Sequence, residues 1–470
     1  MKIGRNNYFF SIIFALALSL LITNTEINAE TWTKVNGVKP YINKIYFPTG
    51  NNSLIAIASE NGDFEKPLDL MDQNLLFPDF GEGFQLSTDK GETFSEEKLI
   101  LFSVYEFIQR IDEPSKWYAS VRSQGRGGIA VSTDNGNSWN TDFLLCDASY
   151  QFMSIIPDKT DANKYYGAAV RSNNGFKYTE DAFSNCVTNE NLNIQARSIA
   201  LSPFNEDLLF IAGDNFYDGG VYRSYNKGQS WLKNEIGLEN LRIHCVIPSA
   251  ADPSIILCGA DSVTSSKEVR GKGIYRSIDT GKTWDRVGAW GASVFAIAQH
   301  PSNPNYLVAA CGYDGVWFSG NGGRTWEPNN SGLPQDISIR NVAFPNWDVT
   351  DEGVIAFAGS FGDGLYKSKR VVANVEENIH YCSNLSVTYL YPNPANNYIF
   401  VEFENPNNQY LNIQIKDILG STVYERNHTY YFTGKQSIRI DLPSNISEGI
   451  YYISVFNGSF NATSKFAIVK

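Results

Sequence analysis

The sequence predicts an all-β protein, with a seven-bladed β-propeller followed by a small C-terminal β-sandwich. Two features of its composition support this class: aromatic residues make up 14% of the 470 residues, while charged residues make up only 19%. Such a chain is globular and rich in strand-forming residues. No long apolar helical periodicity follows the N-terminus, and a short turn sequence recurs with a period in the forties.

The N-terminus predicts a targeting segment over residues 1–29. Lys2 and Arg5 precede an uncharged apolar run at 9–22, and the small residue Ala29 follows. The run is short for a membrane-spanning helix, so we interpret it as a cleaved signal peptide. No later stretch is long and apolar enough to span a membrane. The net charge of -12 argues against a nucleic-acid partner and against docking on anionic lipid.

The recurring sequence is an octet, Ser-x-Asp-x-Gly-x-x-aromatic, seen at 277–284. Related units begin at 87, 132, 179, 224, 277, 319 and 368, so the period is 42–53 residues. Such a period with β composition is typical of propeller blades of four strands. The octet is itself a turn, because its glycine can adopt positive φ and its acidic or amide side chain accepts nearby backbone N–H groups. The residues in this acceptor position are Asp89, Asp134, Asp181, Asn226, Asp279 and Asn321.

Two units depart from the pattern. The unit at 179 has Phe183 in place of glycine and Cys186 in place of the aromatic residue. The unit at 368 has no octet, and so lacks its outermost strand. Residues 31–35 resemble 283–287, where an outermost strand begins, so we expect the N-terminus to complete the last blade and close a ring over 30–370.

One unit shows how a blade is built. In the sixth, strands are expected at 294–298, 306–310 and 315–319, and Trp326 begins the outermost strand. After Lys369 the period stops, and 371–386 reads as a polar linker. Residues 387–470 alternate apolar and polar positions at 398–403, 411–416, 437–442, 450–456 and 463–469, which predicts a β-sandwich.

The cysteines and histidines indicate no metal or redox centre. Cys245 and Cys258 flank a predicted hairpin turn, and they are either a disulfide or two free core cysteines. The six cysteines form no CxxC motif, and the four histidines are scattered. We therefore expect no cofactor and no metal.

The octets resemble the Asp-box (BNR) repeats of sialidases, sortilin-type receptors, photosystem-assembly propellers and xyloglucan-hydrolysing enzymes. The resemblance implies a propeller in which the boxes are structural turns on the face opposite the ligand site. Asp89, Asp134 and Asp279 are then not catalytic.

The tail resembles the type A C-terminal sorting domain of the type IX secretion system of Bacteroidetes. The matching residues are Tyr-Pro-Asn-Pro at 391–394, Leu-Gly at 419–420, Gly-Ile-Tyr at 449–451 and the closing 465–470. This implies that the secretion machinery is a partner, that the tail is removed, and that the protein is released or attached at the cell surface. The alternative is an ordinary accessory sandwich.

Candidate ligand residues lie in the loops between second and third strands and in those that enter the inner strands. Acidic and aromatic residues gathered there suit a sugar site, although long loops are also polar simply because they are solvated. Three arginines enter inner strands at matching places and could clamp a carboxylate, as the sialidase triad does. No Arg-Ile-Pro motif is present and sialidases have six blades, so a role within the repeat is the alternative. The candidates for catalysis are Asp63, Asp69, Asp72, Asp214, Asp218 and Asp261; those for ligand binding are Arg197, Arg242, Arg340, Tyr217, Tyr313, Asp314 and Asp363.

Three functional hypotheses follow. The first is a secreted or surface propeller that binds an extracellular ligand, a glycan or a protein. The second is a glycoside hydrolase of the sialidase or xyloglucanase kind that uses acidic loop residues. The third is a surface adhesion or scaffold protein.

Overall fold

The structure, a computed structural model, describes the chain from Trp32 to Val469 with gaps. The residues described are 32–51, 53–59, 81–148, 150–172, 174–189, 192–214, 219–234, 236–263, 269–347, 354–368, 385–391, 393–405, 409–418, 420–431, 434–457 and 461–469. The predicted signal peptide and most of the predicted linker lie outside them. Among the described residues every element is a strand, and none forms a helix long and apolar enough to cross a membrane.

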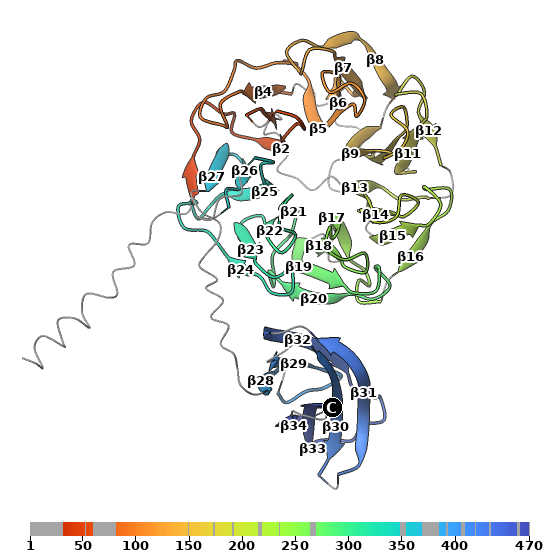
Figure 1. Cartoon of the computed structure of the whole chain (residues 1–470), viewed down its shortest axis with the longest axis vertical. Coiled ribbons are helices and arrows are strands. Elements are labelled where there is room, and N and C mark those ends of the chain that lie inside the picture. Colours follow the sequence, from red (N-terminus) through yellow and green to blue (C-terminus); the bar gives the residue numbers. More distant parts are fainter. Residues whose placement is uncertain are drawn as a thin grey trace, which may run out of the picture.

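Residues 32–368 form seven antiparallel sheets arranged as a ring (Figure 1). We number these blades one to seven by their inner strands, which are β2 (Ile42–Tyr46), β5 (Ser103–Gln109), β9 (Gln151–Pro157), β13 (Ala196–Leu201), β17 (Arg242–Pro248), β21 (Ala296–Gln299) and β25 (Ser338–Ala343). The second strands are β3 (Ile55–Ser59), β6 (Trp117–Ser123), β10 (Tyr165–Val170), β14 (Leu209–Gly213), β18 (Ile256–Val263), β22 (Leu307–Ala310) and β26 (Phe357–Phe361).

The third strands precede the octet turns. They are β4 (Phe84–Ser87), β7 (Arg126–Ser132), β11 (Phe176–Thr179), β15 (Gly220–Ser224), β19 (Val269–Ser277), β23 (Val316–Ser319) and β27 (Leu365–Ser368). The outermost strands of blades two to six are β8 (Asn140–Ala148), β12 (Val187–Thr188), β16 (Leu232–Asn234), β20 (Asp285–Gly288) and β24 (Glu327–Pro328). The prediction of an all-β propeller is therefore confirmed.

Blade seven is completed by the N-terminus, as expected. The strand β1 (Trp32–Lys34) pairs antiparallel with β27, with Trp32 opposite Ser368. The Trp32 ring is fully buried, and its Nε1 donates to the Asn329 carbonyl of blade six at 2.8 Å. Lys34 pairs with Asp363 in the turn between β26 and β27. The two ends of the ring are thus joined by strand pairing, ring burial and an ion pair.

The octet turns have the hydrogen bonds that their sequence predicts. Around Asp279, the backbone N–H groups of Lys282 and Thr283 donate to the carboxylate at 2.9 Å, and Ser277 Oγ donates at 2.7 Å. Gly281 adopts φ +76 and donates its N–H to Ser277 Oγ at 2.8 Å. Burial acts to raise the pKa of Asp279, but the bonds from Thr283 and Ser277 outweigh it and lower the pKa. The carboxylate is therefore part of the turn.

Each interface between neighbouring blades has its own apolar cluster. The last residue of the octet packs into the interface with the preceding blade, and Trp32 takes this place in blade seven. The other aromatic residues of this kind are Phe94, Trp139, Trp231, Trp284 and Trp326.

Blade three fills its interface with blade two in a different way, because its octet lacks both the glycine and the final aromatic residue. Its octet has Phe183 at the glycine position with φ 72, and the ring stacks on Tyr165 with centroids 4.6 Å apart. Cys186, at the aromatic position, forms a disulfide with Cys146 in the outermost strand of blade two. A covalent link between two blades therefore replaces a packed aromatic ring.

The remaining cysteines in the described residues are free. Cys258 lies opposite Val246 in the antiparallel pair of β17 and β18, so it points to the opposite face of the sheet from Cys245. Of the two alternatives left open by the sequence, the structure shows two free cysteines.

The C-terminal part is a two-sheet sandwich. One sheet has the order β28–β29–β32 and the other β31–β30–β33–β34, and residues of both form one apolar core. Its strands are β28 (Ser386–Tyr391), β29 (Tyr398–Asn405), β30 (Gln409–Asp417), β31 (Thr422–Tyr431), β32 (Gly434–Asp441), β33 (Gly449–Phe456) and β34 (Asn461–Ile468). The sequence interpretation missed β28 and β31. The predicted linker is one residue too long, because Ser386 already belongs to β28.

Candidate ligand site at the ring centre

Inner strands of the ring carry β-bulges near their starts. A bulge leaves one residue out of the ladder and redirects its side chain. In blade four, Ala196 pairs with Gly213 and Ser198 with Ala212, so Arg197 is the extra residue. In the described residues, six of the seven inner strands have such a register shift at the equivalent position. The extra residues are Asn43, Tyr105, Met153, Arg197, His244 and Arg340.

In blade six Phe295 takes the corresponding place, directly before β21, and its N–H donates to the Ala310 carbonyl at 2.9 Å. One such residue per blade therefore lies near the start of its inner strand, and the inner strands surround the ring centre (Figure 1). Blades one to three contribute Asn43, Tyr105 and Met153, whereas blades four to seven contribute two arginines, a histidine and a phenylalanine. The ring centre is chemically asymmetric.

At three of these bulges, the residue that follows the bulge bonds to a neighbouring blade. Ser198 Oγ accepts the Val246 N–H of the next blade at 3.4 Å, and Asn341 Oδ1 accepts the Ile45 N–H at 3.1 Å. In blade two this residue is Glu106, which pairs with Lys44 Nζ of blade one at 2.8 Å. These bonds fix the inner strands against one another, so the bulge residues are presented by a rigid frame.

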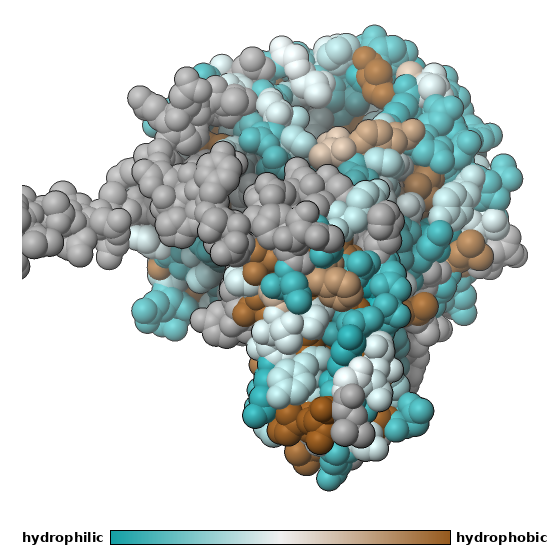
Figure 2. Space-filling view, turned by 60° about the horizontal axis from the view of Figure 1, so that its bottom comes forward, coloured by the Kyte–Doolittle hydropathy of each residue, from teal (hydrophilic) through white to brown (hydrophobic). Residues whose placement is uncertain are grey.

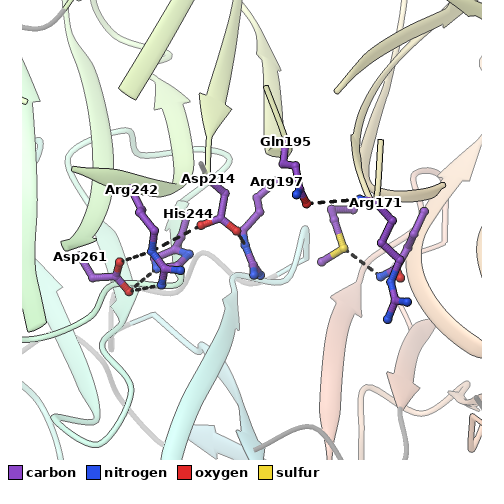
Figure 3. A network of polar contacts seen from close by, with 9 residues as sticks. Arg171, Gln195, Arg197, Asp214, Arg242, His244 and Asp261 are labelled. Atoms are coloured by element: carbon purple, nitrogen blue, oxygen red, sulfur yellow. Dashed lines mark hydrogen bonds and ion pairs between the residues drawn. The ribbon is translucent and has the colours of Figure 1, made fainter. Parts of the chain in front are cut away.

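A polar network runs from blade four into blade five (Figure 3). Arg197 Nε donates to Asp214, which follows β14. Arg242 donates two bonds to Asp261, from Nε at 2.8 Å and from Nη2 at 3.1 Å, and its Nε lies 3.7 Å from Asp214 Oδ1. His244 Nε2 lies 2.7 Å from Asp261 Oδ2. Arg242 thus links both carboxylates, whose side chains are 4% and 1% exposed.

The electrostatics keep Asp261 ionised. Burial acts to raise its pKa, but His244 and Arg242 contribute attraction and hydrogen bonds that lower it well below its usual range. A carboxyl group in this state accepts hydrogen bonds and does not supply a proton. Within the described residues, Asp214 Oδ1 and His244 Nδ1 have no hydrogen-bond partner. Two buried polar atoms of the network therefore lack the partners that such atoms usually have.

Aromatic rings continue the network into blades six, seven and one. The His244 ring lies 5.1 Å from the Phe295 ring. The Arg340 guanidinium lies 5.3 Å from Phe295 and 3.9 Å from Phe361, and Phe361 contacts Tyr41 edge-on at 5.0 Å. We call this set of residues the arc. Its members are Arg197, Asp214, Arg242, His244, Asp261, Phe295, Arg340, Phe361 and Tyr41.

Tyr313 lies beside the arc. It is 72% exposed in the turn between β22 and β23. Its neighbour Gly312 exchanges two backbone hydrogen bonds with Ile339, at 3.0 and 2.9 Å, so this turn is tied to the start of β25 next to Arg340. An exposed aromatic side chain is thereby anchored near the guanidinium.

The structure corrects one prediction about the arginines. Arg197 and Arg340 occupy bulge positions, but Arg242 lies two residues before the bulge residue of its blade, which is His244. The three arginines are therefore not at matching places. A bulge has no sequence signature here. The sequence therefore indicated Arg242 as the candidate of this blade, and His244 was missed.

The other candidates fall into four groups. Asp363 bonds to Lys34 and to Tyr366 Oη, so it takes part in closing the ring. Asp314 is exposed in a tight turn, where its N–H donates to the Cys311 carbonyl at 3.0 Å. Asp214 and Asp261 belong to the arc. The remaining candidates, Asp63, Asp69, Asp72, Tyr217 and Asp218, lie outside the described residues.

A surface cavity lies elsewhere. It has a volume of about 780 Å³ and is lined by Thr88 and Thr93 of one octet turn and by Asn135 and Asn137 of the next. It therefore lies between blades one and two on the octet face. The octet carboxylates Asp89 and Asp134 are bonded within their own turns, so they contribute to the turns of this face.

Comparison with known proteins supports the two-part organisation. Residues 389–470 match the family model described as a secretion system C-terminal sorting domain. A GH74 enzyme from Niastella koreensis has a TM-score of 0.52 at 12% identity, covering 94% of this chain and 68% of that one. An ancestral GH74 enzyme has a TM-score of 0.53 at 13% identity, covering 93% and 63%. YCF48 from Cyanidioschyzon merolae has a TM-score of 0.48 at 12% identity, covering 72% and 98%.

At these identities the solved structures show the fold alone. No curated protein matches the chain. The chain is thus a β-propeller followed by a type IX secretion sorting domain, and that domain indicates export to the cell surface or the extracellular space.

Proposed function

We propose that this exported propeller binds an extracellular glycan at the ring centre, through the arc and Tyr313. The observation that carries the proposal is the packing of the Arg340 guanidinium 3.9 Å from the Phe361 ring, with the exposed Tyr313 in a turn that is bonded to the start of the same inner strand. Planar donors and ring faces held on a rigid frame suit a polyhydroxyl ligand, because rings cover pyranose faces while guanidinium groups bond hydroxyl or carboxylate oxygens.

The arc also supports binding electrostatically. The described residues of the arc include three arginines, Arg197, Arg242 and Arg340, and two carboxylates, Asp214 and Asp261, so their formal charges sum to a positive value in a chain whose net charge is -12. Acidic sugars would gain from this excess, and neutral sugars would still use the donors and rings. The ligand panel for a binding test therefore needs both kinds.

Hydrolysis is the second candidate, and the described carboxylates favour it less. A glycosidase needs one carboxyl group that holds a proton and gives it to the leaving group. Asp261 has its pKa lowered, and both it and Asp214 are engaged by arginine. An adhesion or scaffold role, the third candidate, would not need an organised ring centre.

The test is a glycan array of neutral and acidic oligosaccharides probed with the full chain, combined with a hydrolysis screen. We expect binding without product release, and a loss of at least tenfold in affinity for Arg340→Ala. Lys282→Ala, on the octet face, is the matched control and should bind as the wild type does. Absence of binding to every glycan would contradict the proposal, and hydrolysis that is lost in Asp214→Asn would favour the enzyme.

A further inference from the structure

The sorting domain contacts the ring at the outer edge of blade five. Strand β32 of the sandwich lies beside β20 of the ring (Figure 1). Phe400 of β29 meets the Trp290 ring edge-on, with centroids 5.8 Å apart and planes at 86°. Trp290 follows β20, outside the arc, so this contact is separate from the candidate ligand site.

The chemistry on the two sides is matched. On the ring, the Arg286 guanidinium lies 4.5 Å from the Trp290 ring. On the sorting domain, Tyr398 contacts Phe400 at 5.7 Å, and the Arg439 guanidinium lies 4.6 Å from Tyr398. Three rings therefore lie in a row across the boundary, with one guanidinium at each end, and each guanidinium contacts a ring of its own domain.

Charges add to this match. Asp285 of β20 lies within electrostatic range of Arg426 and Arg439 of the sorting domain. Ring carboxylate and domain guanidinium groups attract each other, whereas Asp441, which pairs with Arg439 at 2.7 Å, limits the attraction. The contact is nevertheless small, because Trp290 keeps 48% of its surface exposed. Figure 2 shows hydrophilic residues over much of one face of the molecule, with apolar residues gathered in several groups.

We propose that the outer edge of blade five, formed by Asp285, Arg286 and Trp290, is a docking surface for the sorting domain of the same chain. The docked state exists while the peptide between the two domains is intact and is lost when that peptide is cut.

The small size of the contact explains why the sorting domain docks in the intact chain and why it leaves once the chain is cut. One aromatic pair, Trp290 with Phe400, crosses the boundary, and the attraction between Asp285 and the sorting-domain arginines adds to it, so the contact supports a dissociation constant on the order of mM or weaker. A short tether holds the partners at an effective concentration on the order of mM, so a large share of intact chains is docked. Once separated at μM concentration, only about one in a thousand remains docked. Cutting the chain therefore acts as the release step.

Disulfide trapping in the full chain tests the docked state. Trp290→Cys is combined with Phe400→Cys, in a background where Cys382 is replaced by serine to avoid exchange. The matched control combines Trp290→Cys with Tyr452→Cys, an exposed aromatic on the other sheet of the sandwich. We expect the first pair to cross-link at least tenfold faster than the control on mild oxidation. Equal rates would overturn the proposal.

Two further measurements test the weakness of the contact. In small-angle scattering, Trp290→Ala should increase the radius of gyration of the full chain, while Leu232→Ala, an exposed apolar residue on blade four, should not. A protease site placed between residues 371 and 384 allows the chain to be cut. The tail should then elute separately at μM concentration, and a tail that stays with the ring would overturn the release step.

Discussion

Removing the disulfide between blades two and three should destabilise the propeller strongly. The perturbation is the double variant Cys146→Ser with Cys186→Ser. The bond closes a loop with a sequence separation of 40, and the loss of chain entropy for such a loop in the unfolded state corresponds to about 4 kcal/mol at 25 °C. The interface retains the Phe183 ring, which is 1% exposed, so we expect a folded but weaker ring.

The assay is urea unfolding followed by tryptophan fluorescence, with and without a thiol-free reductant. Reduced wild type and the double variant should show the same decrease in the free energy of unfolding, about 4 kcal/mol. Reductant should leave the double variant unchanged, which separates this bond from effects on the free cysteines. A decrease below about 1 kcal/mol would refute the entropic reasoning, as would a variant that responds to reductant as the wild type does.

Three other predictions concern the turns and the arc. Phe183→Gly relieves the positive φ but removes a buried ring, so calorimetry should show a net destabilisation of about 2–4 kcal/mol; a more stable variant would show that strain dominates. Asp279→Ala should cost about 2 kcal/mol at pH 7, whereas Asp279→Asn, the choice made naturally at Asn226 and Asn321, should cost little. The Thr93 hydrogen bonds lower the pKa of the octet carboxylate Asp89 to about 2. Because such carboxylates have pKa values below those of the unfolded chain, they contribute to the free energy of unfolding above about pH 4. This contribution is lost as the pH falls toward 2, and melting curves of Asp279→Asn should show a shallower decline over that range than those of the wild type. Arg242→Ala leaves two buried carboxylates without their shared partner and should destabilise the ring by about 3–5 kcal/mol. Arg340→Ala should change thermal stability far less and should reduce glycan binding. If Arg340→Ala were the more destabilising variant and Arg242→Ala the one that lost binding, Arg242 would belong to the ligand site and Arg340 to the frame.

The octet made most of the fold predictable, because its chemistry is local. A glycine, a carboxylate and two hydroxyl groups within eight residues specify a turn without reference to the rest of the chain, and the repeat then indicates the sheets. Closure by Trp32 followed from the same logic, since the outermost strand of one unit was missing and its sequence stood at the other end of the ring.

The arc was only partly predictable, because it depends on register. A bulge moves one residue out of the ladder, and no sequence pattern around His244 indicates that a bulge is present. Strand β31 was missed for a related reason: it is an edge strand whose sequence is largely polar. The Cys146–Cys186 bond joins residues of different blades, so spacing gives no signal, although Cys186 in the aromatic position of an octet marked that interface as unusual.

The pairing of β1 with β27 also sets an order for assembly. Trp32 bonds to a residue 297 positions later in the chain, so the first part of the ring to leave the ribosome has no partner until the seventh blade exists. At synthesis rates of about 5–20 residues per second, that strand waits for tens of seconds with its tryptophan exposed. The ring is therefore completed as a whole, after its last residues have emerged, and a chain interrupted before β27 would leave β26 with an open edge and β1 without its strand partner.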